Sequence, residues 1–334
     1  MIGTFLCTFS LWLFTSLNVC AAYTIKPVTP PIQHSEGPHW IENQQMVYYV
    51  DTFRPTIYRW EYSTGKVSSH RLDHHDSIGI IIPIKDTEDE FVVGADQDIY
   101  RLKWPKEDSN EKIEFVNLAK VQPTKSEKQF NDGKADCHGR IWAGVLTRNE
   151  DLTVQPHGGC LYMVTVNGTI EKEEKISNTS ISNGLAWTKD SKKFYFIDST
   201  ERTVTGYDYD QTSGEIENKT TVFNLADHPD LKGIPDGMII DDEDNLWVAL
   251  FGGTSVVHLN PSTGKIIKVI TIPATYVTSA CFGGPELDVL YVTTSRLHLN
   301  ETEQLKEPLA GSVFAIEDLG VKGVRGHAAI FNLS

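Results

Sequence analysis

Short apolar runs recur along the whole chain, and turn sequences separate each run from the next. Examples are MVYYVD from Met46, FYFID from Phe194 and NLWVAL from Asn245. A second run follows each of these after a short loop, as TIYRWE follows MVYYVD. Turns such as STGK and TSGE close several of the pairs. The pattern predicts β-strands joined by short turns, and no sustained helical periodicity interrupts it.

A further run precedes each pair, and it opens with small or polar residues before turning apolar. The runs EGPHW, NDGKAD, SNGLAW and PDGMII are of this kind. Gly133, Gly184 and Gly237 within them are spaced about fifty residues apart, close to the length of a propeller blade. Six such units indicate an all-β fold, a six-bladed β-propeller. We expect residues 23–334 to form this single domain.

In four of these runs, the residue before glycine has a side-chain oxygen that could bind a metal ion. These residues are Glu36, Asp132, Asn183 and Asp236. The innermost strand of each propeller blade lines the central channel, so the side chains should converge on one mouth of it. Carboxylate and amide oxygens suit Ca²⁺, Mg²⁺ or Mn²⁺ better than Zn²⁺. The alternative interpretation is that Asp-Gly and Asn-Gly serve here only as turn residues.

A cation at this mouth is compatible with two roles, between which the residue pattern does not choose. It can polarise a carbonyl and lower the pKa of bound water, as in a hydrolase. It can equally be a structural ion on the propeller axis. The motif DHHD at residues 73–76 has metal-like composition, but we interpret it as a solvated loop. His39 is interpreted as a packed histidine, and no Gly-x-Ser-x-Gly elbow indicates a serine hydrolase.

The first 22 residues differ from the rest of the chain. They contain no Asp, Glu, Lys or Arg and end in the small residues VCAA. This is typical of a secretory signal peptide, with cleavage near Ala21 or Ala22, and an uncleaved anchor is the alternative. Secretion and glycosylation are the resulting expectations. Five sequons agree with them, at Asn167, Asn178, Asn218, Asn300 and Asn332.

Charge and cysteine content limit the classes of partner. A net charge of −15 argues against nucleic acid, because phosphate repels an acidic surface. The predicted mature chain keeps Cys137, Cys160 and Cys281, an odd number without a CxxC spacing. We therefore expect three buried thiols, with one disulfide and a free thiol as the alternative. The expected partner is a small-molecule substrate, with no membrane contact after signal cleavage, and we expect a monomer.

Several motifs in order resemble the senescence marker protein, regucalcin and gluconolactonase family, and most of all its insect luciferin-regenerating branch. The motifs are SEGPHW, FNDGKAD, SNGLAW, IPDGM, LWVALFGG, FGGPELDVLYVT and LGVKG. The resemblance extends over about residues 30–325. It implies a six-bladed propeller that holds one divalent cation and hydrolyses sugar lactones or related esters.

The resemblance also assigns roles to individual residues. Glu36, Asn183 and Asp236 match the metal ligands, with Ca²⁺ as the expected ion and Zn²⁺, Mn²⁺ or Mg²⁺ as alternatives. Asp236 also matches the general base, although a carboxylate bound to a cation is a weak base. Asn131 matches a residue that contacts the substrate and metal-bound water.

Two departures from the family pattern concern the substrate. Gln129 stands where sugar-lactonase members have an arginine, and an amide lacks the charged fork of arginine. Asn149 stands near the position of a sugar-contacting glutamate. We therefore expect Gln129, Asn131 and Asn149 to bind substrate, with its class left open. The predicted function is a secreted, metal-dependent lactone or ester hydrolase. The alternatives are a calcium-binding protein without turnover and a luciferin-regenerating type of small-molecule enzyme.

Overall fold

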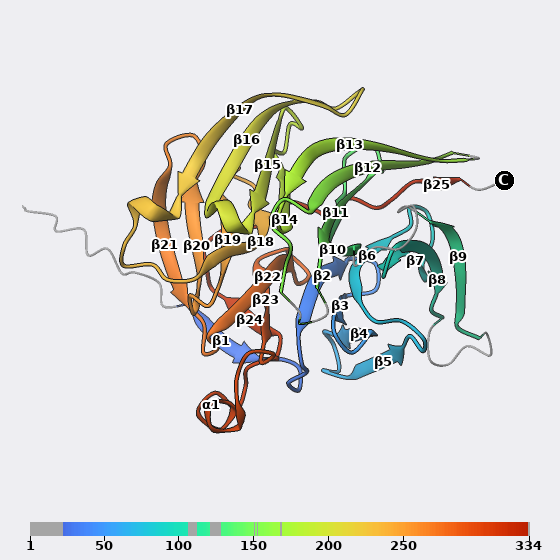
Figure 1. The fold of residues 1–334 in the computed structure, drawn as a ribbon. Coiled ribbons are helices and arrows are strands. Elements are labelled where there is room, and N and C mark those ends of the chain that lie inside the picture. Colours follow the sequence, from blue (N-terminus) through green and yellow to red (C-terminus); the bar gives the residue numbers. More distant parts are fainter. Residues whose placement is uncertain are drawn as a thin grey trace, which may run out of the picture.

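The computed structural model describes residues 23–105, 112–120, 128–149, 151, 153–167 and 169–332, so the predicted signal peptide lies outside the described part. The fold is all-β and propeller-like, which confirms the predicted fold class at that level. Six antiparallel four-stranded meanders surround a common centre. In the first five the chain runs outward from an innermost strand, and in the sixth the N-terminal strand supplies the outermost position (Figure 1).

The first three meanders correspond to the first three repeat units of the sequence. The first contains β2 (Ser35–Ile41), β3 (Met46–Asp51), β4 (Thr56–Glu61) and β5 (Val67–Arg71). The second contains β6 (Ile78–Pro83), β7 (Glu90–Ala95), β8 (Asp98–Lys103) and β9 (Glu114–Lys120). The third contains β10 (Lys128–Ala135), β11 (Ile141–Thr147), β12 (Gly159–Asn167) and β13 (Thr169–Thr179).

The last three meanders continue this order, and the N-terminal strand completes the sixth. The fourth contains β14 (Ser182–Trp187), β15 (Lys193–Asp198), β16 (Thr203–Asp210) and β17 (Glu215–Asn224). The fifth contains β18 (Ile234–Ile240), β19 (Leu246–Phe251), β20 (Ser255–Asn260) and β21 (Lys265–Thr271). The sixth contains β22 (Tyr276–Gly283), β23 (Val289–Ser295), β24 (Phe314–Glu317) and β1 (Thr24–Pro27).

The innermost strands contact one another in a closed ring, in the order β2, β6, β10, β14, β18, β22 and back to β2. Strand pairing does not separate six sheets, however. The fifth and sixth meanders form one eight-stranded sheet, because Phe251 on β19 pairs with Tyr276 on β22. Pairing of β1 with β24 joins the start of the described chain to its last meander. The ring therefore closes between distant parts of the sequence.

Helical structure is sparse in the described residues. It comprises α1 (Glu301–Lys306), η1 (Ser199–Glu201) and η2 (Leu225–Asp227). None of these helices is long and apolar enough to cross a membrane. The C-terminal segment runs across one end of the ring and ends in β25 (Phe331–Asn332), which pairs with β12 (Figure 1).

Apolar side chains from neighbouring meanders pack face to face and form the core. One cluster joins the first and second meanders through Tyr48, Val50, Ile78 and Phe91. Tyr48 and Ile78 are fully buried, so burial of such large side chains supplies most of the driving force for packing. The innermost strand β14 is buried along its whole length, whereas β2 and β10 keep partly exposed polar residues near their starts.

The three cysteines and the acidic histidine motif can now be placed. Cys160 and Cys281 are buried and all three thiols are free, whereas Cys137 is only partly buried, so the prediction of three buried thiols was wrong for that residue. The DHHD motif lies in a turn, as predicted, where His75 pairs with Asp96 at 2.8 Å.

Candidate metal centre and substrate mouth

Each innermost strand is irregular near its start. The pairing with the second strand shifts register between Phe130 and Gly133 on β10, between Ser182 and Leu185 on β14, and between Pro235 and Met238 on β18. The other three innermost strands, β2, β6 and β22, have shifts at the corresponding place. A bulge redirects side chains and is common beside functional sites.

The bulges contain the residues that the sequence pattern selected. Asn131 and Asp132 lie in the bulge of β10, Asn183 in that of β14 and Asp236 in that of β18. The glycine after Asn183 permits close packing here, because a Cβ on Gly184 would stand 2.8 Å from the backbone oxygen of Asp236. Neighbouring inner strands therefore bring these polar side chains to one mouth of the ring.

Three carboxylates interact electrostatically at this mouth. Burial raises the pKa of Glu36 well above its usual range, and the charges of Asp236 and Asp132 raise it further. Burial and the charge of Asp132 likewise raise the pKa of Asp236. Burial also raises the pKa of Asp132, against the opposing charge of Lys134. The site thus concentrates negative charge in a water-poor environment, which is costly without a cation.

The Asn183 amide is held in place from two sides. Its Nδ2 donates a hydrogen bond of 3.0 Å to the Ser199 hydroxyl, and the side chain also hydrogen-bonds Asp236. Asp132 accepts a bond of 2.7 Å from the Gly133 N–H through Oδ1, while Oδ2 is buried without a hydrogen-bond partner among the described residues. An orphaned buried carboxylate oxygen is unusual and indicates a missing ligand.

These observations fit a hard divalent cation. Within the described chain, no three His, Cys, Asp or Glu side chains are arranged as a metal-binding group. The predicted set of Glu36, Asn183 and Asp236 therefore depends on the amide oxygen of Asn183 as its third donor. Two carboxylates and one amide leave further coordination positions for water or substrate, as Ca²⁺ commonly has in proteins.

The three residues predicted to bind substrate lie in different environments. Asn131 donates a hydrogen bond of 3.1 Å from Nδ2 to the Ser182 carbonyl, beside the metal candidates. Gln129 is partly buried, and its Nε2 has no hydrogen-bond partner among the described residues. Asn149 is exposed on the loop after β11, where its Nδ2 donates to Thr153 Oγ1 at 2.9 Å. Asn149 is therefore engaged with its own loop.

An aromatic and imidazole rim, which the sequence analysis missed, surrounds the same mouth. The second strand of each meander runs antiparallel to the first, so its end lies beside the start of the innermost strand. His34 lies 5.0 Å from Phe53 and 6.3 Å from Phe251, measured between ring centres. Phe251 in turn contacts Tyr276 at 4.7 Å and His298 at 5.7 Å.

His34 connects this rim to the carboxylates. Its Nε2 lies 3.9 Å from Glu36 Oε1, and its Nδ1 lies 2.8 Å from the Ser295 hydroxyl. Burial, together with the charges of Arg148 and His298, lowers the pKa of His34 to about 3. His34 is therefore a neutral imidazole near pH 7.

Arg148 supplies the positive charge of the rim. Its guanidinium carbon lies 5.0 Å from the centre of the Phe53 ring, and burial lowers its pKa. Arg148 lies directly after β11, which ends at Thr147, and immediately precedes Asn149. The sequence analysis did not select Arg148, because no local pattern indicates that its guanidinium faces the aromatic rim.

Comparison with known proteins places the chain in a family. Residues 34–296 match the SMP-30/Gluconolactonase/LRE-like region. Regucalcin from Xenopus laevis is 34% identical over 290 residues, which cover 86% of this chain and 92% of that protein. A solved luciferin-regenerating enzyme superimposes with a TM-score of 0.83 at 33% identity, covering 93% of this chain and all of that one.

A more distant structure has the same fold. Regucalcin from Agrobacterium tumefaciens, described as a calcium-binding protein, superimposes with a TM-score of 0.78 at 19% identity and covers 93% of this chain and 98% of its own. These matches agree with the resemblance expected from the motifs. The chain belongs to the SMP-30/gluconolactonase/LRE-like family.

Proposed function

We propose that this protein is a divalent-metal-dependent hydrolase of lactones or related esters. The observation that carries the proposal is the convergence of Glu36, Asn183 and Asp236 at one mouth, where burial and neighbouring negative charge raise the pKa of both carboxyl groups. Asn131 lies beside them with an amide suited to substrate binding. The family match supports the reaction class, because its description includes gluconolactonase.

We propose Ca²⁺ as the bound cation. Mn²⁺, Mg²⁺ and Zn²⁺ are the alternatives against which it should be tested. The calcium-binding description of the Agrobacterium relative supports this choice, as does the all-oxygen donor set. When bound, a divalent cation supplies Lewis-acid polarisation of a carbonyl and lowers the pKa of water.

The protein's own residues have separate roles in this proposal. Glu36 and Asn183 hold the cation, and Ser199 orients the Asn183 amide. Asp236 holds the cation and assists proton transfer. Asp132 is a second candidate for the proton acceptor, because its Oδ2 is buried at the same mouth without a hydrogen-bond partner in the described chain. A carboxylate that does not bind the cation is the stronger base.

The rim favours a substrate with a flat apolar part over a sugar. Phe53, Phe251 and Tyr276 provide aromatic surface, and Arg148 provides a cation for a polar or anionic end of the substrate. Gln129 and Asn149 are neutral, so sugar hydroxyls find fewer charged partners here than the family resemblance implies. Aromatic lactones and esters are therefore the first substrates to test.

We further propose that the closed ring is a six-bladed propeller forming one domain over residues 23–334. The eight-stranded sheet then counts as two blades that share the Phe251–Tyr276 pair. We also propose that the protein is secreted after removal of residues 1–22. It is then glycosylated at its sequons and is a monomer. N-terminal sequencing of secreted protein tests the first point, and a start near Tyr23 is expected.

Two other functions remain as alternatives. A calcium-binding protein without turnover would need the same ligands, and the relative from Agrobacterium supports it. A luciferin-regenerating type of enzyme would use the aromatic rim, and the likeness to the solved luciferin-regenerating enzyme supports it.

The deciding experiment is hydrolysis of a lactone and ester panel with each cation or a chelator. The panel contains gluconolactone, dihydrocoumarin and phenyl acetate, and Asn183→Ala serves as the site-dead control. We expect turnover that requires a cation and is lost in Asn183→Ala. Tight cation binding without turnover on any substrate would favour the calcium-binding alternative.

A further inference from the structure

A cavity lies at the ends of the innermost strands that are opposite the metal candidates. Its volume is about 370 Å³, and it lies between the strand ends and residues 324–328 of the C-terminal segment. His39 at this end is three residues beyond Glu36 on β2, which corresponds to a distance of about 10 Å along a strand. The volume lies within the range of small-molecule sites. The cavity is therefore large enough for a ligand and distinct from the metal candidates.

Most of the cavity wall is apolar and aromatic. The lining includes Trp40, Trp187, Ile239, Phe282 and Leu287. Trp40 and Trp187 are each 7% exposed, and both indole N–H groups are buried without a hydrogen-bond partner among the described residues. A buried unpaired donor is costly unless an acceptor reaches it. Protein atoms cover both indole N–H groups, so the wall presents apolar surface and suits an apolar body.

A cluster of hydrogen-bond donors, Lys134, His39 and His327, lies on one side of the cavity. Lys134 on β10 donates hydrogen bonds from Nζ to the backbone oxygens of Leu185 and Met238, the first at 2.9 Å. An ammonium group has three N–H donors, so these two bonds leave one. His39 lies close enough that burial, Lys134 and His327 together lower its pKa to about 4. Burial also lowers the pKa of His327.

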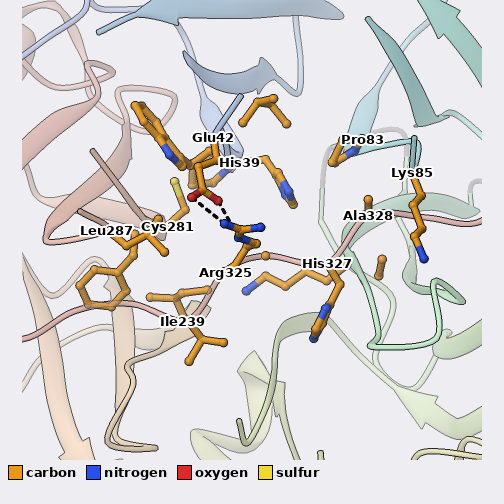
Figure 2. Close-up of a pocket in the computed structure, with 18 of the residues that line it drawn as sticks. His39, Glu42, Pro83, Lys85, Ile239, Cys281, Leu287, Arg325, His327 and Ala328 are labelled. Atoms are coloured by element: carbon orange, nitrogen blue, oxygen red, sulfur yellow. Dashed lines mark hydrogen bonds and ion pairs between the residues drawn. The ribbon is translucent and has the colours of Figure 1, made fainter. Parts of the chain in front are cut away.

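Two of the carboxylates near this cluster already have partners. Glu42 forms a two-point ion pair with Arg325 at 2.6 and 2.7 Å, as Figure 2 shows. Asp136, whose charge reaches His327, accepts a bond of 2.7 Å from Arg140. Asp132, which interacts with Lys134, lies at the other mouth. The cavity lining also includes Asp86, and the charge of Asp132 reaches Lys134, so the donors of the cluster lie beside two further carboxylates.

The C-terminal segment forms a roof over this cluster. Backbone bonds anchor it on both sides, from Gly323 N to Leu287 O and from Ala329 N to Pro83 O, each 2.8 Å long. Between the anchors Arg325 reaches Glu42, and His327 and Ala328 line the cavity (Figure 2). A Cβ on Gly326 would stand 3.2 Å from the His39 ring. Glycine at this position thus preserves space between the roof and His39.

We propose that this cavity is a second ligand site, which binds a small organic carboxylate with an apolar or aromatic body. Lys134, His39 and His327 supply donors for the carboxylate, and the tryptophan, phenylalanine and aliphatic walls cover the body. Hydrogen bonds to an ionised acceptor are stronger than those between neutral groups. The site should therefore bind a carboxylate more tightly than a neutral ligand of the same shape. The proposal does not depend on the lactonase function, because it uses none of the metal or substrate residues.

Isothermal titration calorimetry on the mature chain with 2-naphthoate tests this site. The neutral 2-naphthalenemethanol is the matched control ligand. We expect one binding site for the carboxylate and binding at least about tenfold weaker for the alcohol. Equal affinity of the two ligands, or no carboxylate binding up to about 1 mM, would overturn the proposal.

Variants locate the bound ligand. Lys134→Met and the double variant His39→Phe/His327→Phe, which remove N–H donors, should each weaken 2-naphthoate binding by about tenfold. Asn183→Ala at the other mouth should leave it unchanged. Because Lys134 joins three inner strands, Lys134→Met can fail to fold, and the histidine double variant then decides. Undiminished binding in the double variant, or loss of binding in Asn183→Ala, would assign the ligand elsewhere and contradict the proposal.

Discussion

Asp136 accepts a hydrogen bond of 2.9 Å from the indole Nε1 of Trp142, and Asp241 accepts one of the same length from Trp247. In both meanders the aspartate follows the innermost strand and the tryptophan lies on the second strand, six residues later. Asp136 and Asp241 are completely buried. A buried carboxylate that satisfies several donors ties the loop to the core, so this repeated pair is a structural feature of the propeller.

The first prediction concerns Asp136→Asn. Asp136 also accepts bonds from Arg140 Nε at 2.7 Å and the Tyr209 hydroxyl at 2.8 Å, so the change leaves Arg140 without its buried counter-charge. We expect the free energy of unfolding to fall by about 3–5 kcal/mol. Urea denaturation measures this, with the exposed Asp230→Asn as control. A loss equal to that of the control would contradict the structural role.

The second prediction concerns Asp236→Asn. Because the pKa of Asp236 is raised in the folded state, its ionisation costs stability as pH rises through that pKa, and a neutral amide removes this cost. We therefore expect the variant to melt at a higher temperature than the wild type in chelator at pH 7. Added Ca²⁺ should stabilise the wild type but not the variant.

Thermal unfolding with and without Ca²⁺ measures both effects. Asp230→Asn changes an exposed residue of the loop before β18, so this variant should respond to Ca²⁺ as the wild type does. If Asp236→Asn keeps the full Ca²⁺ stabilisation, Asp236 is not a ligand.

The third prediction separates Asn183 from Ser199. Asn183→Ala removes an oxygen ligand and should abolish cation binding. Ser199→Ala removes only the group that orients the amide, so affinity should fall by about tenfold. Calorimetry with Ca²⁺ measures both, and the exposed Ser213→Ala is the matched control. Equal loss in Ser199→Ala and Asn183→Ala would mean that Ser199 does more than orient the amide.

The fourth prediction concerns substrate choice. Gln129→Arg should raise kcat/KM for gluconolactone relative to dihydrocoumarin, because a guanidinium can bind oxygen atoms with two parallel bonds. Gln129→Lys adds the same charge without the fork and should have a smaller effect. Competition between the two lactones measures the ratio. An unchanged ratio in Gln129→Arg would place the substrate away from position 129.

The fifth prediction concerns acid stability. The pKa of His39 is lowered to about 4 in the folded protein, whereas the unfolded chain titrates near 6.5. The unfolded state therefore binds more protons in this window, and stability falls as pH drops from 6.5 to 4. The slope of the unfolding free energy against pH reports the difference in bound protons between the two states. In His39→Gln this difference should be smaller by up to about one proton. An unchanged slope would mean that His39 is already protonated in the fold.

The buried carboxylates act in the opposite direction. The pKa values of Glu36, Asp132 and Asp236 are raised in the folded state. At pH values above the ordinary carboxyl pKa, the folded state therefore binds more protons than the unfolded state. Acidification from neutral pH thus stabilises the metal-free fold through these groups. Comparison of His39→Gln with the wild type at each pH cancels this contribution.

Much of the fold could be predicted because its signals are local. Strand period, turn residues and the repeated glycine at positions 133, 184 and 237 depend on neighbours a few residues away. The same applies to Glu36, Asn183 and Asp236, which stand at equivalent places in their repeats. The structure brings these residues to one mouth because the inner strands form a ring.

The sequence by itself thus determined the all-β repeat and the polar residues at the start of each inner strand. Only the tertiary structure decided which side chains meet across the ring. Phe53, Arg148 and Tyr276 form one rim, and residues 324–328 roof a cavity beside Lys134, although nothing near them in sequence indicates these contacts. The reason is physical: strand formation depends on local preferences, whereas the facing of distant side chains depends on ring closure and the packing of every blade.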